Sequence, residues 1–301
     1  MGARSIKRTT EDYIIDTIVY VILAVVFIAT VYPFYYSLVI SFNNGIDASL
    51  GGIYFWPREF SLDNYIAVFS NEQLLSGFAV TISRTVIGTV ATLLFTGLFA
   101  YSLSYPHLMF RKTYITLLII AMYFSGGLIP YFILLKKLHL MNTFLVYIIP
   151  LLLNAFYTII MLSFFRELPV ELKESAKMDG AGDLRIFWQI IMPVSKPVFA
   201  TIALFCGVEH WNSWFDSAFF VTDKKLKTIS FMLMELINRA NLTAVQGSTD
   251  VERAATYAAQ TFTAETIRMA TMIVVVVPII CVYPFLQRYF VKGIMIGSIK
   301  G

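Results

Sequence analysis

The densest group of polar side chains in an apolar part of this sequence lies between positions 209 and 216. Polar and ionisable groups in such surroundings face a protein interior or a water-filled cavity. On one continuous helix, Asn212 and Asp216 share a face at i, i+4, and His210 and Trp214 share another. The group predicts the lining of a path for a polar solute. The alternative is an aromatic belt with polar anchors at a membrane interface. The members are Glu209, His210, Trp211, Asn212, Trp214 and Asp216.

Enzymatic chemistry has little support in the sequence. The three histidines, His107, His139 and His210, are too widely spaced to predict a metal site. No Gly-x4-Gly-Lys-Ser/Thr loop occurs, so we expect no ATP binding through a P-loop of this chain. Cys206 and Cys281 lie in apolar runs and are expected to be buried thiols. The sequence therefore predicts no catalytic residue, no metal and no cofactor bound by this chain.

A polar stretch at residues 171–197 separates two strongly apolar runs and forms the second notable feature. Glu171 and Glu174 favour the positive end of a helix that reaches Met178. Gly180 supplies a left-handed position that ends this helix. Apolar residues at helical spacing then predict a second helix with one apolar face, namely Leu184, Phe187, Trp188 and Ile191. The stretch is thus expected to form a compact knob that docks in a groove of another protein.

The composition places these features in a membrane protein. Of 301 residues, 58% are hydrophobic and only 14% are charged, whereas soluble domains carry about 25% charged residues. The net charge of +4 is small and its basic residues are scattered, so nucleic acid is not an expected partner. Membrane lipid is the expected surroundings.

Six runs are apolar and long enough to cross a bilayer, which takes about 20 residues. The first follows basic residues but is too long for a signal peptide, so we expect it to be a retained span. Proline within a run is tolerated where neighbours satisfy the freed carbonyl. The six runs are residues 13–42, 77–103, 114–135, 144–165, 198–221 and 266–286.

The basic residues predict the orientation of these spans. With the N-terminus inside, the inner segments hold thirteen Lys and Arg residues and the longer outer loops hold eight. Arg84 and Arg268 are left out because each lies near a helix end, where it can snorkel. The positive-inside bias therefore predicts both termini and the loop at about 166–197 in the cytoplasm. The outer loops are expected at about 43–76, 136–143 and 222–264, with a structured cap in the first.

Small residues recur every four positions on the second run, at Gly88, Thr92, Thr96 and Ala100. Such a ridge lets two helix backbones approach closely, which would make this run the central helix of the bundle. The alternative is that these are ordinary residues of a spanning helix.

The pattern Glu174-Ser175-Ala176-x3-Gly180-x9-Ile190-x2-Pro193 resembles the EAA motif of permease subunits of ABC importers. In that family the motif folds as a helix–turn–helix whose coupling helix docks in a cleft of the ATPase subunit. Ser175 replaces the usual alanine, and Met192 stands where leucine is common. The resemblance implies ATPase contacts at Glu174, Ser175, Ala176, Met178, Asp179, Gly180, Leu184 and Phe187.

The resemblance extends over the whole chain. Asp63-Asn64-Tyr65 resembles carbohydrate-uptake permeases of the maltose-type class, and residues 124–130, 211–216 and 283–293 resemble a branch that takes polysaccharide-derived oligosaccharides. It implies the all-α type I ABC importer permease fold with six transmembrane helices in a single domain, residues 1–301. It also implies a multi-pass protein of the bacterial cytoplasmic membrane that is itself no enzyme.

The same resemblance implies a set of partners. They are a second, homologous permease subunit, two ATPase subunits that hold ATP and Mg, and an extracytoplasmic solute-binding protein that delivers the sugar. Substrate would pass between the two permeases by alternating access.

Sugars are bound by aromatic stacking together with planar polar side chains. On this ground we expect the pathway to include Trp211, Asn212, Trp214, Asp216 and His210, with Asn154 and Tyr157 on the fourth run. His210 has a structural role as its alternative. Residues 125–127 (Ser-Gly-Gly) unwind readily and are expected as either a path lining, a hinge or a packing site.

Two other functions remain open at this point. An ion-driven secondary transporter of sugars or other small polar solutes would use Glu209 or Asp216 as its coupling carboxylate. A membrane-embedded enzyme is the third possibility, although no paired acidic motif or nucleophile elbow lies at a membrane face. The knob favours the ATP-driven permease, because an ion-coupled carrier needs no surface for docking an ATPase.

Overall fold

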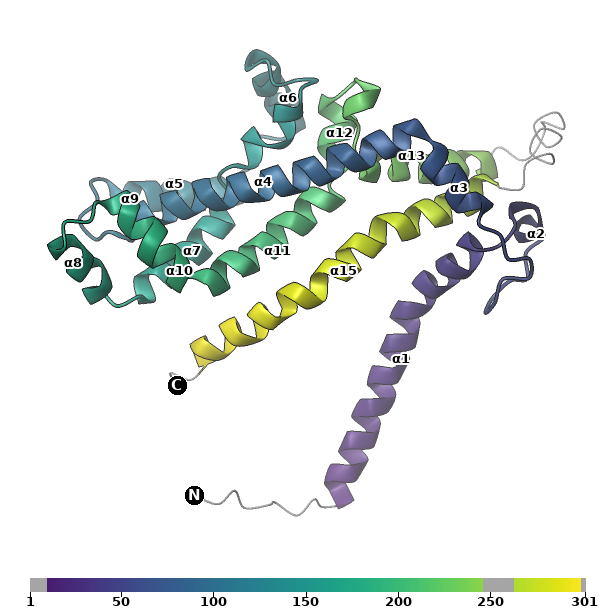
Figure 1. Ribbon diagram of the computed structural model, residues 1–301, viewed down its shortest axis with the longest axis horizontal. Helices are drawn as coiled ribbons and strands as arrows, with labels where there is room; N and C mark the ends of the chain where they lie inside the picture. The colour runs from purple at the N-terminus through teal and green to yellow at the C-terminus, as the bar shows by residue number, and fades with distance from the viewer. Residues whose placement is uncertain (1–9, 246–262, 299–301) are drawn as a thin grey trace. The chain divides into compact units, whose positions relative to one another are not determined.

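Helices make up the regular structure of this protein. The computed structural model describes residues 10–245 and 263–298, and in those ranges its only strand-like feature is an isolated bridge between Asn43 and Phe60. The all-α class is therefore confirmed. The first elements in Figure 1 are α1 (Thr10–Ser41), α2 (Gly45–Ser49), α3 (Asp63–Ser70), α4 (Glu72–Ser104), α5 (Arg111–Tyr123) and α6 (Leu128–Lys137).

The remaining elements lead from a pair of short 3₁₀ turns to a long final helix. They are η1 (Phe144–Tyr147), η2 (Ile149–Leu151), α7 (Ala155–Glu167), α8 (Glu171–Met178), α9 (Asp183–Ile186), the π-helical turn η3 (Phe187–Ile191), α10 (Met192–Val194), α11 (Lys196–Asn212), α12 (Phe215–Phe220), η4 (Lys224–Leu226), α13 (Ile229–Val245) and α15 (Ala264–Ser298).

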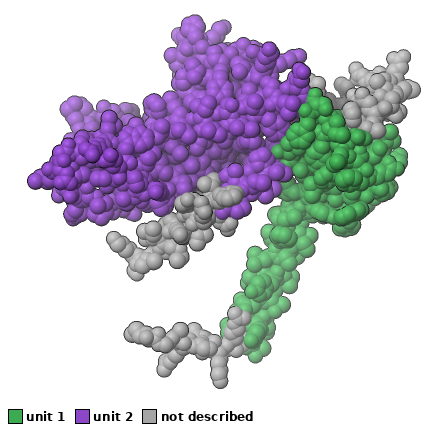
Figure 2. Space-filling view, in the orientation of Figure 1, with its two compact units in different colours: residues 1–70, 239–274 green, residues 71–238, 275–301 purple. Residues whose placement is uncertain are grey.

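Two compact units divide the chain, and Figure 2 shows them in different colours. One unit comprises residues 1–70 and 239–274, and the other comprises residues 71–238 and 275–301. The single permease domain over residues 1–301 stays a prediction, as do the expected bounds of its loops.

The expected spans correspond to three straight helices and three bent pairs. Among the described residues, α1, α4 and α15 over Ala264–Val282 are each long and apolar enough to cross a membrane. The count reaches six only if each bent pair is one span, so six spans stay a prediction. The pairs are Arg111–Tyr123 with Leu128–Lys137 at 119°, Phe144–Leu151 with Ala155–Glu167 at 45°, and Asp183–Val194 with Lys196–Asn212 at 83°.

The residues at the break between α5 and α6 explain that break. The end of α11 has no such local explanation. Between α5 and α6, Gly127 has a φ of +79°, which suits glycine, so the expected unwinding at this point is confirmed. The expectation of one continuous run over residues 198–221 is wrong, because α11 ends at Asn212. No glycine or proline marks that end. It is fixed by a distant residue, since the Ser213 carbonyl accepts a hydrogen bond from Arg84.

The helix α4 is the centre of the larger unit, as its small residues predict. Gly88, Thr92, Thr96 and Ala100 are all buried. A Cβ added at Gly88 would lie 2.5 Å from the His210 ring of α11. On the α7 side, the hydroxyls of Thr92 and Thr96 donate to backbone carbonyls of η2 and the residue after it, at 2.9 and 3.2 Å. The ridge therefore holds α11 and the start of the α7 pair against α4.

The core of this unit lies where α4, α7 and α11 meet the η3 turn. Phe187 is fully buried, with its ring centroid 5.4 Å from that of Tyr101 and 6.4 Å from that of Phe199. Phe165 of α7 packs 6.2 Å from Phe199. The knob is therefore built into the same core as the long helices.

In the other unit, residues after α1 form the structured cap that the sequence predicts. The Nδ2 atom of buried Asn64 donates to the carbonyls of Ser41 and Asn43 at 3.0 and 2.8 Å. The hydroxyls of Tyr65 and Ser41 lie 2.7 Å apart. A hydrogen bond from the Asn43 side chain lowers the pKa of Asp47, whose carboxylate also pairs with Arg58. These bonds hold the cap to the end of α1.

Two further expectations have mixed outcomes. The flank that precedes the polar middle of the long loop after residue 222 is helical in α13, as expected, whereas most of the polar middle and of the flank after it lies outside the described residues. Cys206 is buried, but the expectation of a buried Cys281 is wrong. Its neighbours Ile280 and Val282 are exposed as well, so the described part of this chain leaves this stretch of α15 largely uncovered.

Candidate functional site

Residues 171–182 form a helix and a tight turn with an exposed apolar tip. The helix α8 spans Glu171–Met178, as predicted. Gly180 has a φ of +76°, which confirms the expected left-handed position, and the Ala181 amide closes the turn on the Ala176 carbonyl at 2.9 Å. Ala176 is buried, whereas Glu174, Ser175 and Asp179 are exposed. Met178 is 88% exposed, so the tip presents an apolar side chain to whatever covers it.

The second helix of the knob carries the four predicted apolar residues, and the core covers only two of them. Phe187 and Ile191 are fully buried and anchor the helix in the core. Leu184 and Trp188 point outward and are 67% and 45% exposed. The pairs 184/188 and 187/191 each follow the i, i+4 spacing, and the exposed pair stands at the edge of the face that the core covers. Together with Met178, this pair leaves exposed apolar side chains on both helices of the knob.

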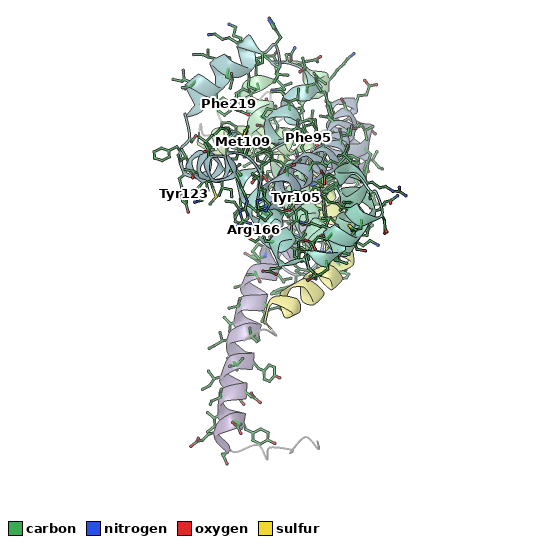
Figure 3. The ribbon with its side chains drawn as sticks, turned by 90° about the vertical axis from the view of Figure 1, so that its left-hand side faces the viewer. Phe95, Tyr105, Met109, Tyr123, Arg166 and Phe219 are labelled. Atoms are coloured by element: carbon green, nitrogen blue, oxygen red, sulfur yellow. The ribbon has the colours of Figure 1, made fainter. Side chains whose placement is uncertain are left out.

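Polar contacts hold the knob to the end of α4. The Lys173 ammonium donates to the Ser104 hydroxyl at 3.0 Å and lies over the rings of Tyr101 and Tyr105. Burial lowers the pKa of Lys173. The Tyr105 hydroxyl, whose residue is labelled in Figure 3, donates to Asp183 at 2.9 Å. That bond lowers the pKa of Asp183, which also pairs with Lys177. These contacts hold the base of the knob in position, and none of them involves Met178 at its tip.

A cavity of about 540 Å³ lies between α7 and α11 and gathers three of the predicted pathway residues. Asn154 and Tyr157 line it from the start of α7, and Asn212 lines it from the end of α11. The Tyr157 hydroxyl donates to the Oε2 atom of Glu209 at 2.9 Å. Asn154 also caps α7, because its Oδ1 atom accepts from the Tyr157 amide at 3.2 Å. The full lining is Asn154, Phe156, Tyr157, Phe205, Val208, Glu209 and Asn212.

The other predicted pathway residues do not line this cavity. Trp211 is buried and its indole N–H donates to the Val275 carbonyl at 3.1 Å. His210 is buried against Gly88, and neither ring nitrogen has a hydrogen-bond partner among the described residues. Trp214 is exposed in the break before α12. The expected shared faces of 212 with 216 and of 210 with 214 do not form, because the helix ends at Asn212.

Asp216 forms part of a buried ion pair rather than a free polar lining. The Arg84 guanidinium is fully buried, pairs with Asp216 and donates to the Ser213 carbonyl at 3.0 Å. It also lies 4.6 Å from the ring centroid of Tyr147. The expectation that Arg84 snorkels is therefore wrong. A buried charge needs such partners, and here they tie α4 to α12 and η1.

Sequence reasoning named Glu209 but did not select it, and it missed two aromatic residues of the cavity. Phe205, Glu209 and Asn212 follow one another at i, i+4 and i+7 along α11, which is one helix face. This spacing in the sequence would have predicted that the three side chains share one surface. Phe156 carries no such signal, because its place depends on where α7 begins. The glycines at 126 and 127 line a separate cavity of about 520 Å³.

The chain matches a family of transport proteins and several of its members. The family described as binding-protein-dependent transport system inner membrane component matches residues 76–296. Protein LplC of Bacillus subtilis (strain 168) is 38% identical over 272 residues, which cover 90% of each chain. The polygalacturonan/rhamnogalacturonan transport system permease protein YtcP of the same strain is 33% identical and covers 97% of this chain and 100% of its own.

A solved structure shares the fold. It is described as a bacterial ABC transporter involved in the import of the acidic polysaccharide alginate, and the matching chain is 28% identical with a TM-score of 0.86. The match covers 95% of this chain and all of the other. The permease fold that the EAA-like pattern implies is thereby confirmed. This chain belongs to the family of inner membrane components of binding-protein-dependent transport systems.

Proposed function

We propose that this chain is the transmembrane permease subunit of an ATP-driven ABC importer of oligosaccharides. It works beside a second, homologous permease in the bacterial cytoplasmic membrane. Two ATPase subunits hold ATP and Mg and supply the energy, and an extracytoplasmic solute-binding protein delivers the sugar. Alternating access between the two permeases moves the substrate, and this chain performs no catalysis.

The exposed apolar tip of the knob carries this proposal. Met178, Leu184 and Trp188 leave apolar surface in contact with water at the end of a polar segment. Such surface is costly unless a partner covers it, and clustered apolar side chains of this kind anchor protein interfaces. The base of the knob is packed around Phe187 and Ile191, so a force on the tip acts on the core. A docked ATPase that changes shape would therefore move this segment.

The chain connects the knob directly to the cavity. Only Ser195 separates α10 from α11, and the two helices meet at a bend of 83°. The opposite end of α11 carries Glu209 and Asn212, which line the cavity with Tyr157 of α7. A tilt of α11 at its knob end would change the distance between α11 and α7 at the cavity. This geometry supports coupling between the ATPase and the substrate path.

The substrate class follows from the cavity and from the relatives. The cavity combines aromatic rings with planar polar groups, the pairing that recognises the apolar face and the hydroxyls of a sugar. The relative YtcP is named for the transport of polygalacturonan and rhamnogalacturonan. Both observations support an oligosaccharide as the cargo of this chain.

The docking role is tested by placing a charge on the tip. We expect Met178→Asp to abolish co-purification of the ATPase subunits, because a carboxylate in an apolar cleft loses its hydration. Membrane insertion should be unchanged. Met109→Asp is the matched control, since Met109 is 73% exposed in the α4–α5 loop (Figure 3). Full ATPase recovery with the Met178 variant would reject the docking role.

A further inference from the structure

We infer that the loop after α2, residues 50–57, is an aromatic anchor that inserts into the lipid interface beside the outer end of α1. Its three consecutive aromatic side chains, Tyr54, Phe55 and Trp56, contact the boundary between lipid headgroups and hydrocarbon. The inference goes beyond the import of sugar. It rests on one part of the proposed function, namely that α1 spans the membrane with its Ser41 end outside.

The backbone of this loop is held firmly while its aromatic side chains stay exposed. Ile53 is buried in one cluster with the last turns of α1. The Arg58 guanidinium donates to the Gly51 carbonyl at 2.9 Å and pairs with Asp47. Trp56 is nevertheless 78% exposed, and the two aromatic residues before it are exposed as well. Exposed apolar rings that are grouped and fixed in this way mark a surface that meets another apolar phase.

Contacts with α1 set the level of the loop. The Tyr35 hydroxyl donates to the Phe55 carbonyl at 2.5 Å, and the ring centroids of Tyr32 and Phe55 lie 6.2 Å apart. The two tyrosines precede Ser41, the last residue of α1, by about 9 and 14 Å along the helix axis. Figure 1 shows the segment between α2 and α3 turning back beside the end of α1. The loop therefore lies beside the helix and not beyond its end.

The sequence of α1 places this level at the outer boundary of the hydrocarbon core. The last charged side chain of α1 is Asp16, and residues 17–42 contain none. A helix crosses the core in about 20 residues, so a core that begins after Asp16 ends near Tyr36. The loop contacts α1 at Tyr32 and Tyr35, just inside this boundary. Tyrosine and tryptophan are enriched there, because the ring is apolar while its O–H or N–H reaches the headgroups.

The composition of the loop fits lipid better than sugar. Residues 48–57 contain no charged side chain and no asparagine or glutamine. A sugar site pairs aromatic rings with planar polar groups, which this stretch lacks. A lipid interface needs rings with a single polar atom, which Tyr54 and Trp56 provide. The charges that flank the loop, Asp47 and Arg58, pair with each other at 3.1 Å and therefore do not oppose its insertion.

Photo-crosslinking identifies what covers the loop. The importer is assembled in vesicles of phosphatidylethanolamine and phosphatidylglycerol with Trp56→benzoylphenylalanine, whose ketone bonds to a neighbouring C–H group on irradiation. We expect the mass of this chain to rise by that of one phospholipid. Glu59→benzoylphenylalanine is the matched control and should lack this adduct, since Glu59 is exposed but its carbonyl accepts from the Asn44 amide, beyond the end of α1. An adduct of the Trp56 variant with the second permease or the binding protein, or no adduct, would overturn the inference.

Fluorescence tests the depth of the loop without a foreign side chain. The difference in emission between the wild-type importer and its Trp56→Phe variant isolates Trp56 from the other tryptophans. Lipids with brominated acyl chains should quench this difference, whereas iodide in the water should not. Quenching by iodide and not by brominated lipid would place Trp56 in water and reject the anchor. The proposed docking of an ATPase is judged separately by the Met178 variant, so either proposal can fail alone.

Discussion

At the scale of single residues, Arg84 shows how a buried charge is held in place. Its side chain is fully buried among groups that lie far away in the sequence, and its Nε atom has no partner among the described residues. A buried charge costs free energy that only well-placed partners offset. Asp216, the Ser213 carbonyl and the Tyr147 ring supply those partners. Arg84 therefore fixes where α11, the helix that lines the cavity, ends.

Removing the Arg84 charge should destabilise the protein more than removing the pair. We expect Arg84→Met to lower the free energy of unfolding by about 3 kcal/mol, because Asp216 is left as an unpaired carboxylate. The double variant Arg84→Met/Asp216→Leu should recover more than half of that loss. Thermal unfolding of the detergent-solubilised importer measures both. Strictly additive losses would show that the two residues do not act as a pair.

The residue scale also shows what sequence reasoning can reach. The turn at Gly180 was predictable because it depends on one residue and its neighbours. The pairing of Arg84 with Asp216 was not, because the two lie 132 positions apart and nothing local marks the end of α11. The assumption of a continuous helix also misplaced Trp214 and Asp216, whereas Asn154, Tyr157 and Asn212 line one cavity; the role of these residues in a substrate path stays a prediction.

At the scale of elements, the close approach of α4 and α11 explains the central place of α4. Gly88 has room only for a hydrogen, because a Cβ would lie 2.5 Å from two atoms of the His210 ring. The period of small residues predicted this contact, since it needs no knowledge of the partner helix. The exposure of Leu184 and Trp188 on the second knob helix was not predictable in this way. Apolar spacing shows that an apolar face exists but not which of its residues the core covers.

A methyl group at Gly88 should separate the two helices, and a smaller partner should rescue it. We expect Gly88→Ala to lower the free energy of unfolding by about 1–3 kcal/mol through overpacking against the imidazole. Adding His210→Ala should restore much of the stability, because the ring is what the new methyl meets. Thermal unfolding measures the cycle. No rescue by the second substitution would mean that the ring does not set the helix separation.

At the scale of the whole molecule, the larger unit holds both the proposed docking tip and the cavity between α7 and α11. The tip at Met178, the core around Phe187 and the cavity at Glu209 all belong to that unit. The family match, residues 76–296, includes most of that unit together with residues 239–274 of the other unit. Function at this scale could be predicted from the sequence because the EAA-like pattern is contiguous. The cavity could not, since it depends on how α7 and α11 meet.

The most direct test of the coupling claim changes the backbone of the turn at Gly180 without removing a side-chain contact of the knob. Gly180 has a φ of +76° with open space around it, so an isoleucine there is strained only by its backbone. Gly182 has ordinary backbone geometry and equally open space, which makes Gly182→Ile the matched control. The readout is ATP hydrolysis by the reconstituted importer with and without sugar-loaded binding protein. We predict that Gly180→Ile abolishes the stimulation while Gly182→Ile retains it and both variants insert normally. Full stimulation in the Gly180 variant would contradict the account.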